Sequence, residues 1–256
     1  MFRRAIVRPP SANFAHGLTT ADLGVPDHRL ALAQHAAYAE ALERCGLDVI
    51  RLPDDPRHPD ATFVEDTAVL TPRAAILTRP GAPSRAGEVE GVRAALAPWY
   101  PEPLEIMAPG TLDGGDVCET ERGFLVGISD RTNEEGAAQL ARHLAVHGAP
   151  STFLDVRGVQ GILHLKSGVS SLGDGRVAAI DAFAGHPALR GYEVVPVASE
   201  ESYAANCVRV NGRVLVAAGF PRFERALRAL GVEMLALDVS EFAKMDGGLS
   251  CLSLRF

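Results

Sequence analysis

Four short polar segments hold the side chains that could perform chemistry, and each lies where a predicted strand ends. They are DATFVED (60–66), LDGGDV (112–117), LHLKS (163–167) and MDGGLSCL (245–252). The first places the carboxylates of Asp60, Glu65 and Asp66 beside the apolar run at 67–70. A carboxylate is rarely buried without a cation to pair with it, so this segment indicates a cationic partner or ligand. A solvated loop at a strand edge is the competing interpretation.

Only one of the four cysteines has the surroundings of a nucleophile. Cys251 follows a Gly-Gly turn that can present the thiol at a strand end, where it could be activated as a thiolate. We expect Cys45, Cys118 and Cys207 to be buried structural thiols. No CxxC spacing is present, so the sequence suggests neither a zinc ribbon nor a disulfide framework.

The LHLKS segment contains the histidine that we single out. If the segment is a strand, alternation places His164 and Lys166 on the same face. The seven other histidines are expected to be structural or exposed, and none lies at metal-ligand spacing from His164. In the LDGGDV segment, two glycines between Asp113 and Asp116 permit a tight turn and a close approach to a ligand or another strand, although a plain turn would look the same.

A recurring unit must position these segments. Five times a helical pattern ends, usually at a glycine, and passes into a short strand. The helices are predicted at 28–45, 89–96, 137–144, 182–190 and 223–230, and the strands that follow them at 47–52, 104–107, 152–156, 193–197 and 233–237. Further short strands are predicted at 67–70, 74–78, 123–128, 176–180 and 213–218. Asn211-Gly212 predicts a hairpin turn, and Thr132 with Glu135 predicts a capping box.

The junctions recur roughly every 40–55 residues with no linker between them. This spacing favours one closed, pseudo-symmetric α/β domain over residues 1–256. A doubly wound sheet is the default for alternating strands and helices, but the intervening hairpins count against it. Neither GxGxxG nor GxxxxGK[ST] occurs, so nucleotide binding has no support.

The composition limits the class of protein. The 256 residues are 47% hydrophobic and 22% charged, which is typical of a folded globular protein. The net charge of −7 offers no basic surface for a nucleic acid, and no apolar run is long enough to cross a membrane. We expect a cytoplasmic protein with reduced thiols, because the N-terminus lacks the apolar run of a signal peptide.

Taken in order, the segments FVED, TRPGAPSR, LDGGDV, RTNEEGA, LHLKS, AANC and MDGGLSC resemble the dimethylarginine dimethylaminohydrolases of the guanidine-modifying (pentein) superfamily. Each segment alone is weak, but the ordered set is specific and covers nearly the whole chain, from Leu18 to Cys251. The resemblance implies a five-bladed α/β propeller around a central polar channel. It also implies hydrolysis of mono- or asymmetric dimethylarginine to L-citrulline and a methylamine through a covalent cysteine thiouronium, with no metal and no organic cofactor.

The resemblance further implies a role for each matching residue. Cys251 corresponds to the nucleophile, His164 to the general acid and later base, and Asp113 to the carboxylate beside the histidine, where some relatives have Glu. The remaining residues correspond to the substrate site. Asp60, Glu65 and Asp66 resemble acidic residues that grip the guanidinium end or support those that do. Arg85 and Arg131 resemble the residues that hold the α-carboxylate, and Leu18 and Met245 resemble the lid and backbone contacts near the substrate.

Other members of the superfamily supply the alternatives. Arginine and agmatine deiminases carry an acidic residue two positions after the catalytic histidine, where this chain has Lys166. Loss of that carboxylate fits a site that accepts alkylated nitrogen, so we favour a methylated guanidino amino acid as the small-molecule partner. A deiminase or another guanidine-modifying hydrolase remains the first alternative. A non-catalytic ribosome-binding factor of the same fold is least favoured, and the sequence leaves the oligomeric state open.

Overall fold

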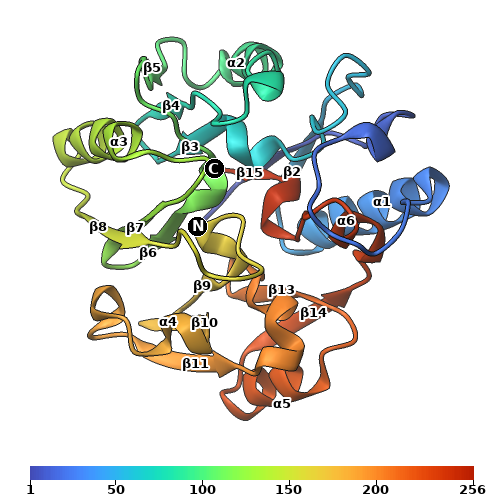
Figure 1. The fold of residues 1–256 in the computed structure, drawn as a ribbon, viewed down its shortest axis with the longest axis vertical. Helices are drawn as coiled ribbons and strands as arrows, with labels where there is room; N and C mark the ends of the chain where they lie inside the picture. Colours follow the sequence, from blue (N-terminus) through green and yellow to red (C-terminus); the bar gives the residue numbers. More distant parts are fainter.

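Five separate three-stranded sheets lie around a common centre in the computed structural model, which describes residues 1–256 (Figure 1). In every sheet the middle strand pairs antiparallel with one neighbour and parallel with the other. A parallel pair needs a crossover connection, and in each unit a helix supplies it. The repeat is therefore β-β-α-β, and the prediction of a five-bladed α/β propeller is confirmed.

The elements of the five units follow the chain, except that the unit closing the ring draws on both of its ends. That unit comprises β15 (Leu254–Arg255), β1 (Arg4–Val7), α1 (His28–Arg44) and β2 (Asp48–Arg51). The next comprises β3 (Ala68–Leu70), β4 (Ala75–Leu77), α2 (Glu88–Leu96) and β5 (Leu104–Glu105). The third comprises β6 (Val117–Thr120), β7 (Gly123–Ile128), α3 (Glu134–Val146) and β8 (Ser151–Asp155). The fourth comprises β9 (Val169–Gly173), β10 (Arg176–Ile180), α4 (Asp181–Ala184) and β11 (Glu193–Val197). The fifth comprises β12 (Val208–Val210), β13 (Arg213–Ala217), α5 (Pro221–Ala229) and β14 (Glu233–Leu237), and α6 (Ser240–Ala243) follows it.

The ring is closed by the two ends of the chain. Strand β15 pairs antiparallel with β1, so that Leu254 lies opposite Ile6. The backbone N–H of Arg4 also donates to the carbonyl of Phe256, at 2.7 Å. Both termini consequently lie near the middle of the ring in Figure 1.

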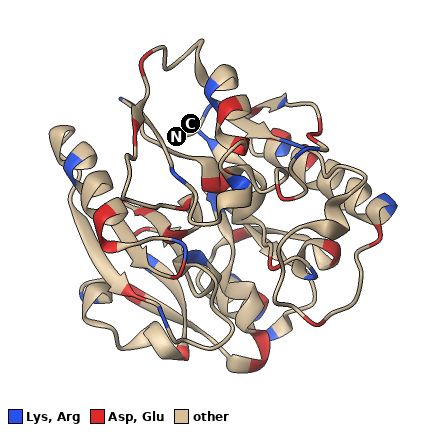
Figure 2. Ribbon diagram, turned by 45° about the horizontal axis from the view of Figure 1, so that its top comes forward, with Lys and Arg blue, Asp and Glu red and all other residues tan.

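The helices lie at the periphery and bury one face against their sheets (Figure 1). On α3, the predicted stripe of Ala137, Leu140 and Leu144 is fully buried. This spacing places all three side chains on one face of a helix. Acidic and basic residues are interspersed around the ring in Figure 2. No helix combines the length and the apolar character that a membrane span requires.

Three local features predicted from the sequence can be compared with the structure: one hairpin turn is confirmed, and one helix boundary and one capping box are wrong. Asn211 and Gly212 form the predicted hairpin turn, with φ values of 48° and 91° as a type I′ turn requires. The predicted helix at 182–190 is wrong: α4 ends at Ala184, and a separate 3-10 turn begins at Pro187, whose ring cannot continue a helix.

The predicted capping box at the start of α3 is also wrong. Asn133, not Thr132, is the N-cap, and its side chain accepts a hydrogen bond from the N–H of Gly136 at 2.8 Å. The hydroxyl of Thr132 instead donates to the buried carboxylate of Asp116, at 2.7 Å. A buried carboxylate needs donors, and that requirement takes the threonine away from the helix end.

Closure of the ring predicts that the last strand is essential for stability. Leu254 is 4% exposed and packs in a core cluster with Ile6 and Leu77. Leu254→Ala should lower the free energy of unfolding by about 2–5 kcal/mol, because it leaves a cavity at the seam. The matched change Leu32→Ala, at a position that is 39% exposed, should cost less than about 0.5 kcal/mol. Denaturant unfolding measures both, and equal losses would contradict the assignment of the seam.

Candidate active site

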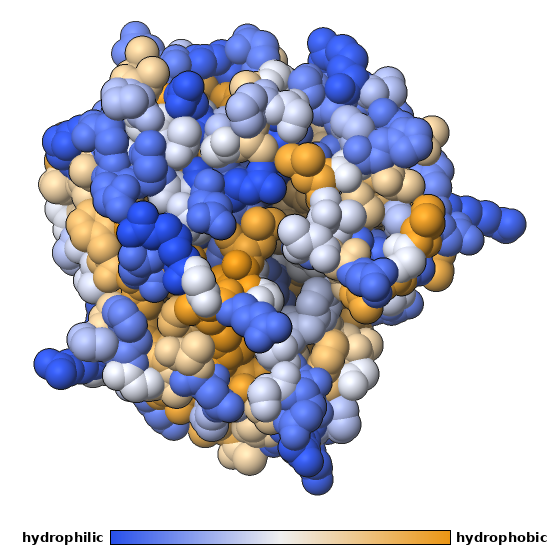
Figure 3. Space-filling view, viewed as in Figure 1, coloured by the Kyte–Doolittle hydropathy of each residue, from blue (hydrophilic) through white to orange (hydrophobic).

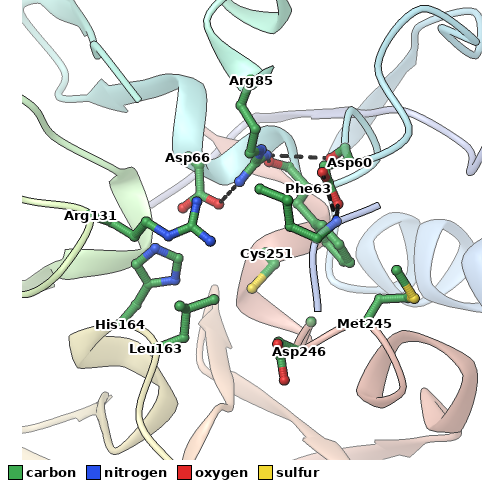
Figure 4. Close-up of a pocket in the computed structure, with 12 residues that line it drawn as sticks. Asp60, Phe63, Asp66, Arg85, Arg131, Leu163, His164, Met245, Asp246 and Cys251 are labelled. Carbon is green, nitrogen blue, oxygen red and sulfur yellow. Dashed lines mark hydrogen bonds and ion pairs between the residues drawn. The ribbon is translucent and has the colours of Figure 1, made fainter. Parts of the chain in front are cut away.

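A pocket near the centre of the ring brings together residues from three of the four polar segments of the sequence, and Asp113 of the fourth segment bonds His164. It is lined by Leu18, Asp60, Phe63, Asp66, Arg85, Arg131, Leu163, His164, Met245, Asp246, Gly247 and Cys251. In Figure 4 the thiol of Cys251 and the ring of His164 are directed into the same space. On the face drawn in Figure 3, hydrophobic and hydrophilic side chains meet around a hollow near the centre of the ring.

The four segments converge because each occupies the same place in its unit. Each forms a 3-10 turn directly before, or one residue before, the antiparallel strand of its sheet. These turns span Val64–Thr67, Gly114–Asp116, Leu165–Ser167 and Ser250–Leu252, and they precede β3, β6, β9 and β15. The pseudo-symmetry of the ring therefore brings four segments that are distant in sequence around one centre.

The LHLKS segment is thus a turn, and the prediction that His164 and Lys166 share a strand face is wrong. A 3-10 turn has about three residues per turn, so positions i and i+2 diverge instead of lining up. His164 lines the pocket, whereas Lys166 lies on the other side with its Nζ 2.6 Å from Oε1 of Glu65. Between these two residues, the chain therefore passes from the pocket to its other side.

Buried carboxylates surround His164. Its Nε2 lies 3.0 Å from Oδ2 of Asp113, a residue with no exposed surface, whose Oδ1 accepts from the N–H of Gly81 at 2.8 Å. Burial alone would lower the pKa of His164, but the charges of Asp66 and Asp116 and the hydrogen bond to Asp113 raise that pKa to about 9. The imidazole is therefore protonated at neutral pH and can act as an acid.

Asp116 supports His164 and was not assigned a role from the sequence. Its carboxylate accepts from the hydroxyls of Ser129 and Thr132, at 2.6 and 2.7 Å, and from the N–H of Leu165, at 2.8 Å. The last bond fixes the turn that carries the histidine. The signal in the sequence was the second aspartate of the DGGD segment, an acidic residue directly before an apolar strand.

The Cys251 thiol is buried in the pocket, and its side-chain hydrogen-bond partner is the hydroxyl of Ser250, at 4.0 Å. Burial raises the pKa of Cys251 to about 12, and the charges of Glu65 and Asp66 act in the same direction. The nucleophile candidate is therefore a neutral thiol in the ligand-free protein. Cys45, Cys118 and Cys207 are buried in the hydrophobic core clusters, as expected for structural thiols.

Asp66 is held as a carboxylate by its partners. Burial would raise its pKa, but His164 and Arg85 lower that pKa to about 2. Arg85 is 5% exposed, and its guanidinium bonds Asp66 at 2.6 Å and Glu88 at 2.7 Å. Its Nη2 also donates to the backbone carbonyls of Asp60 and Phe63, so Arg85 is engaged by protein groups although it lines the pocket.

Three other predicted substrate contacts lie at the pocket, together with Arg131. The carboxylate of Asp60 accepts from the N–H of Leu18 at 3.0 and 3.1 Å, and Met245 is buried in the lining. Figure 4 shows the guanidinium of Arg131 in the pocket, and no side chain of the protein forms an ion pair with it. Arg131 is therefore free to bind an anionic group.

The side chain of Glu65 lies next to the turn that carries Cys251. It does not line the pocket, and its Oε2 accepts from the hydroxyl of Ser250 at 2.7 Å. Four lining residues were not among the predicted contacts: Phe63, Leu163, Asp246 and Gly247. The carboxylate of Asp246 accepts from the N–H and the hydroxyl of Thr20, which holds the segment after Leu18 over the pocket.

The glycines of two segments allow close packing at the site. A Cβ at Gly115 would lie 2.8 Å from the ring of His164 and 2.9 Å from Asp66. A Cβ at Gly248 would lie 2.5 Å from the side chain of Asn206. The close approach expected for the first glycine pair is thus an approach to the catalytic candidates themselves.

One group of side chains has the composition of a metal site. Ligand atoms of Asp66, Asp113 and His164 lie within 4.8 Å of one another. These residues already hydrogen-bond each other or their neighbours: Asp66 accepts from Arg85 and from the N–H of Gly115, and Asp113 bonds His164. Their positions are explained by these protein contacts.

Comparisons with known proteins support one family, although no protein-family model matches the chain. The chain is 43% identical, over 257 residues and the full length of both proteins, to N(G),N(G)-dimethylarginine dimethylaminohydrolase of Pseudomonas aeruginosa. It is 39% identical over 254 residues to the protein of that name from Streptomyces coelicolor, covering 99% of this chain and 96% of the relative. The structure superposes with a TM-score of 0.96, at 42% identity and full coverage of both chains, on a cysteine-to-serine variant of the Pseudomonas aeruginosa enzyme complexed with citrulline.

The ordered segments, the five β-β-α-β units and the identity over the full length of these relatives agree, and the chain belongs to the dimethylarginine dimethylaminohydrolase family, with its pentein fold.

Proposed function

We propose that this protein hydrolyses Nω-methylated L-arginine to L-citrulline and a methylamine, with Cys251 as the nucleophile. The observation that carries the proposal is a single pocket in which a thiol and a protonated imidazole lie beside the carboxylate of Asp66. A guanidinium is a delocalised cation and a poor electrophile. A carboxylate can fix its plane, and an acid can protonate the amine that leaves.

The reaction proceeds in two halves. The thiolate of Cys251 forms a bond to the guanidinium carbon, and the C–N bond to the methylated nitrogen breaks as His164 donates its proton to the departing amine. The product of this half is a thiouronium on the cysteine. Neutral His164 then takes a proton from water, and the hydroxide attacks the thiouronium carbon. The C–S bond breaks as the added oxygen loses its proton to solvent, which gives citrulline, the Cys251 thiolate and protonated His164.

The two ends of the substrate meet opposite charges. Asp66, fixed by Arg85, lies at the guanidinium end, while Arg131 is the cation available for the α-carboxylate. Asp60 and Leu18 lie together at the same pocket and can bind the α-amino group, with Met245 packing nearby. Arg85 and Glu65 contribute through these groups, because the first bonds Asp66 and the second lies behind the pocket.

The unit that performs this reaction is the whole ring, residues 1–256, as one catalytic domain without a metal or organic cofactor. Its partner is a small guanidino amino acid, not a nucleic acid or a membrane. Four free cysteines fit a cytoplasmic setting with a reducing environment. The substrate cation supplies what the free pocket lacks: a positive charge next to Cys251 that lowers the pKa of its thiol.

Product analysis tests the substrate class. Purified protein is incubated separately with asymmetric dimethylarginine, monomethylarginine, arginine and agmatine, and the ureido product and released amine are measured. We expect citrulline and a methylamine from the methylated substrates. Citrulline and ammonia from arginine, with no product from the methylated substrates, would instead establish a deiminase.

Replacement of one sulfur atom tests the mechanism. Cys251→Ser should reduce kcat by about 10³-fold or more, because a hydroxyl is a far weaker nucleophile at this position. The matched change Cys45→Ser affects a thiol at the end of α1, and kcat should stay close to that of the native protein. Unimpaired turnover by the first variant would refute the role of Cys251 while leaving the substrate class open.

The pH dependence tests the role of His164. The folded protein raises the pKa of this imidazole from 6.5 to about 9, so the acid form persists through neutral pH and is lost only as the pH rises through about 9. The value of kcat/KM for a methylated substrate should therefore fall above that pH. A decline that begins near the ordinary histidine pKa would show that the carboxylates do not hold the proton on His164.

Removal of one guanidinium tests the recognition of the α-carboxylate. Arg131→Gln should raise KM for monomethylarginine by about 10- to 100-fold with little change in kcat, because it removes a charge-assisted contact distant from the reacting carbon. Activity on methylated agmatine, which lacks the carboxylate, should not change. The exposed Arg73→Gln serves as the matched control, and an equal effect on both substrates would assign Arg131 to another role.

A further inference from the structure

The fate of one proton is not explained by the groups that line the pocket. Cys251 is a neutral thiol before substrate binds, yet it must attack as a thiolate. His164 already carries a proton, so it cannot accept another. Once a guanidino substrate fills the pocket, it lies between the thiol and the solvent on that side. This question rests on the proposed function, because the mechanism requires the thiolate.

A row of polar atoms leads away from the thiol on the side opposite the substrate. The Sγ of Cys251 lies 4.0 Å from the Oγ of Ser250, a contact in which either atom can be the donor. That hydroxyl donates to Oε2 of Glu65 at 2.7 Å. Glu65 and Ser250 are 3% and 1% exposed, so the row runs through the protein interior.

The position of Ser250 in this row is fixed from two sides. The amide of Asn206 donates to the Oγ of Ser250 at 3.2 Å and accepts from its backbone N–H at 2.9 Å. The amide of Asn206 occupies one lone pair of the Ser250 hydroxyl, and the single hydrogen of that hydroxyl is directed to Glu65. The second lone pair is left to accept a proton from the thiol. This is the arrangement that a proton transfer through a hydroxyl requires.

The row ends at a second cavity on the far side of the four central turns, which we call the rear cavity. It has a volume of about 1050 Å³, and its lining includes Glu65, Lys166, Ser250 and Arg255. We call the pocket that contains Cys251 and His164 the front pocket. None of the residues that line the front pocket belongs to the lining of the rear cavity. A cavity of this size with charged walls has room for many water molecules.

We propose that Ser250 and Glu65 conduct the thiol proton of Cys251 to the rear cavity when a cationic guanidine binds in the front pocket. The S–H bond breaks as its proton passes to Oγ of Ser250, and the hydroxyl proton of Ser250 passes to Oε2 of Glu65. The thiolate remains behind, the serine is again a hydroxyl, and the carboxyl group then releases the proton to water in the rear cavity.

Glu65 is the carrier in this sequence and not the final acceptor. Its Oε1 lies 2.6 Å from Nζ of Lys166 and 3.3 Å from the guanidinium of Arg255. Neutral Glu65 would leave two partly buried cations, whose side chains are 12% and 15% exposed, without their counter-ion, which is unfavourable. The two cations therefore drive the proton onward, and the carboxylate is restored for the next turnover.

The rate at which the thiolate forms tests this route separately from its stability. The protein is mixed rapidly with the acetamidine derivative of L-ornithine, which carries the positive charge but has no amine to lose, and thiolate absorbance is followed in the ultraviolet. In the native protein we expect a thiolate signal. In Ser250→Ala its rate of appearance should fall by at least about tenfold, with the final amplitude and ligand affinity retained. Ser171→Ala, a matched change in the rear cavity, should match the native rate.

Glu65→Gln separates conduction from electrostatics. The glutamine oxygen can still accept from Ser250, so the position of the turn is kept, but it cannot carry the proton. Removing the charge of Glu65 should by itself make the thiolate more stable, since that charge raises the pKa of Cys251. A route through Glu65 predicts a slower signal of equal or greater amplitude, whereas electrostatics alone predicts a faster one.

The outcomes distinguish a proton route through Ser250 and Glu65 from a purely electrostatic effect, even if one variant fails to fold. A native rate in either folded variant, a faster signal in Glu65→Gln, or no thiolate in the native protein overturns the proposal. Circular dichroism confirms the fold of each variant. The probe is not hydrolysed, so a native protein that forms the thiolate through Ser250 but yields no citrulline from methylarginine would refute the proposed function alone.

Discussion

The site depends on the interaction of the negative charge of Asp66 with His164 and with the thiol of Cys251. This charge raises the pKa of His164. The pKa of Cys251 is raised first by burial and then by the charges of Glu65 and Asp66, so both reacting groups are protonated in the ligand-free protein. These effects suit the proposed reaction at different moments. The imidazole needs its proton for the leaving amine, while the thiol must lose its proton, and only a bound cation that neutralises Asp66 changes the balance for the thiol. In the proposed reaction, the carboxylate that meets the guanidinium thus also disfavours the thiolate until the substrate arrives.

Burial of the Asp66 carboxylate is unfavourable unless partners compensate its charge, and neighbouring residues provide these partners. Arg85 supplies the counter-charge at 2.6 Å, and Glu88 on α2 in turn fixes Arg85. The N–H of Gly115 donates to the other oxygen of Asp66, at 2.8 Å, from the neighbouring unit. An isolated buried charge would destabilise the protein by several kcal/mol, so these partners are required by the chemistry of the pocket. The pairing also explains why Arg85, although it lines the pocket, is engaged by carboxylates of the protein.

The sequence predicted the fold because its signals were local and repeated. Helical stripes such as Ala137, Leu140 and Leu144 need only the spacing of one helix, and the Asn211-Gly212 turn needs only its own φ values. Five copies of one unit then limited the ways in which the chain could close. The Thr132 capping box failed because a distant residue, Asp116, competed for the threonine hydroxyl. Local rules give way where a buried charge must be satisfied.

The site was predicted in its residues but not in their directions. The resemblance identified Cys251, His164 and Asp113 as a set, and the structure places the first two at one pocket with the third bonded to the histidine. The resemblance could not show which way the side chains of Glu65 and Lys166 point. A strand and a 3-10 turn can have the same order of residues, but they direct the side chains to different sides. The resemblance therefore grouped Glu65 with the acidic residues of the guanidinium end, without separating a substrate contact from a supporting residue.

These directions reveal a division that runs through the centre of the ring. Three of the four central segments place one residue in the front pocket and a near neighbour on the rear side: Asp66 and Glu65, His164 and Lys166, Cys251 and Ser250. The front members are the reacting or substrate-facing groups, and the rear members bond one another through Glu65. Because each pair shares one tight turn, neither layer can shift without moving the other. The rear network therefore fixes the separations among thiol, imidazole and carboxylate, and a substitution in it reaches the reaction without any contact to the substrate.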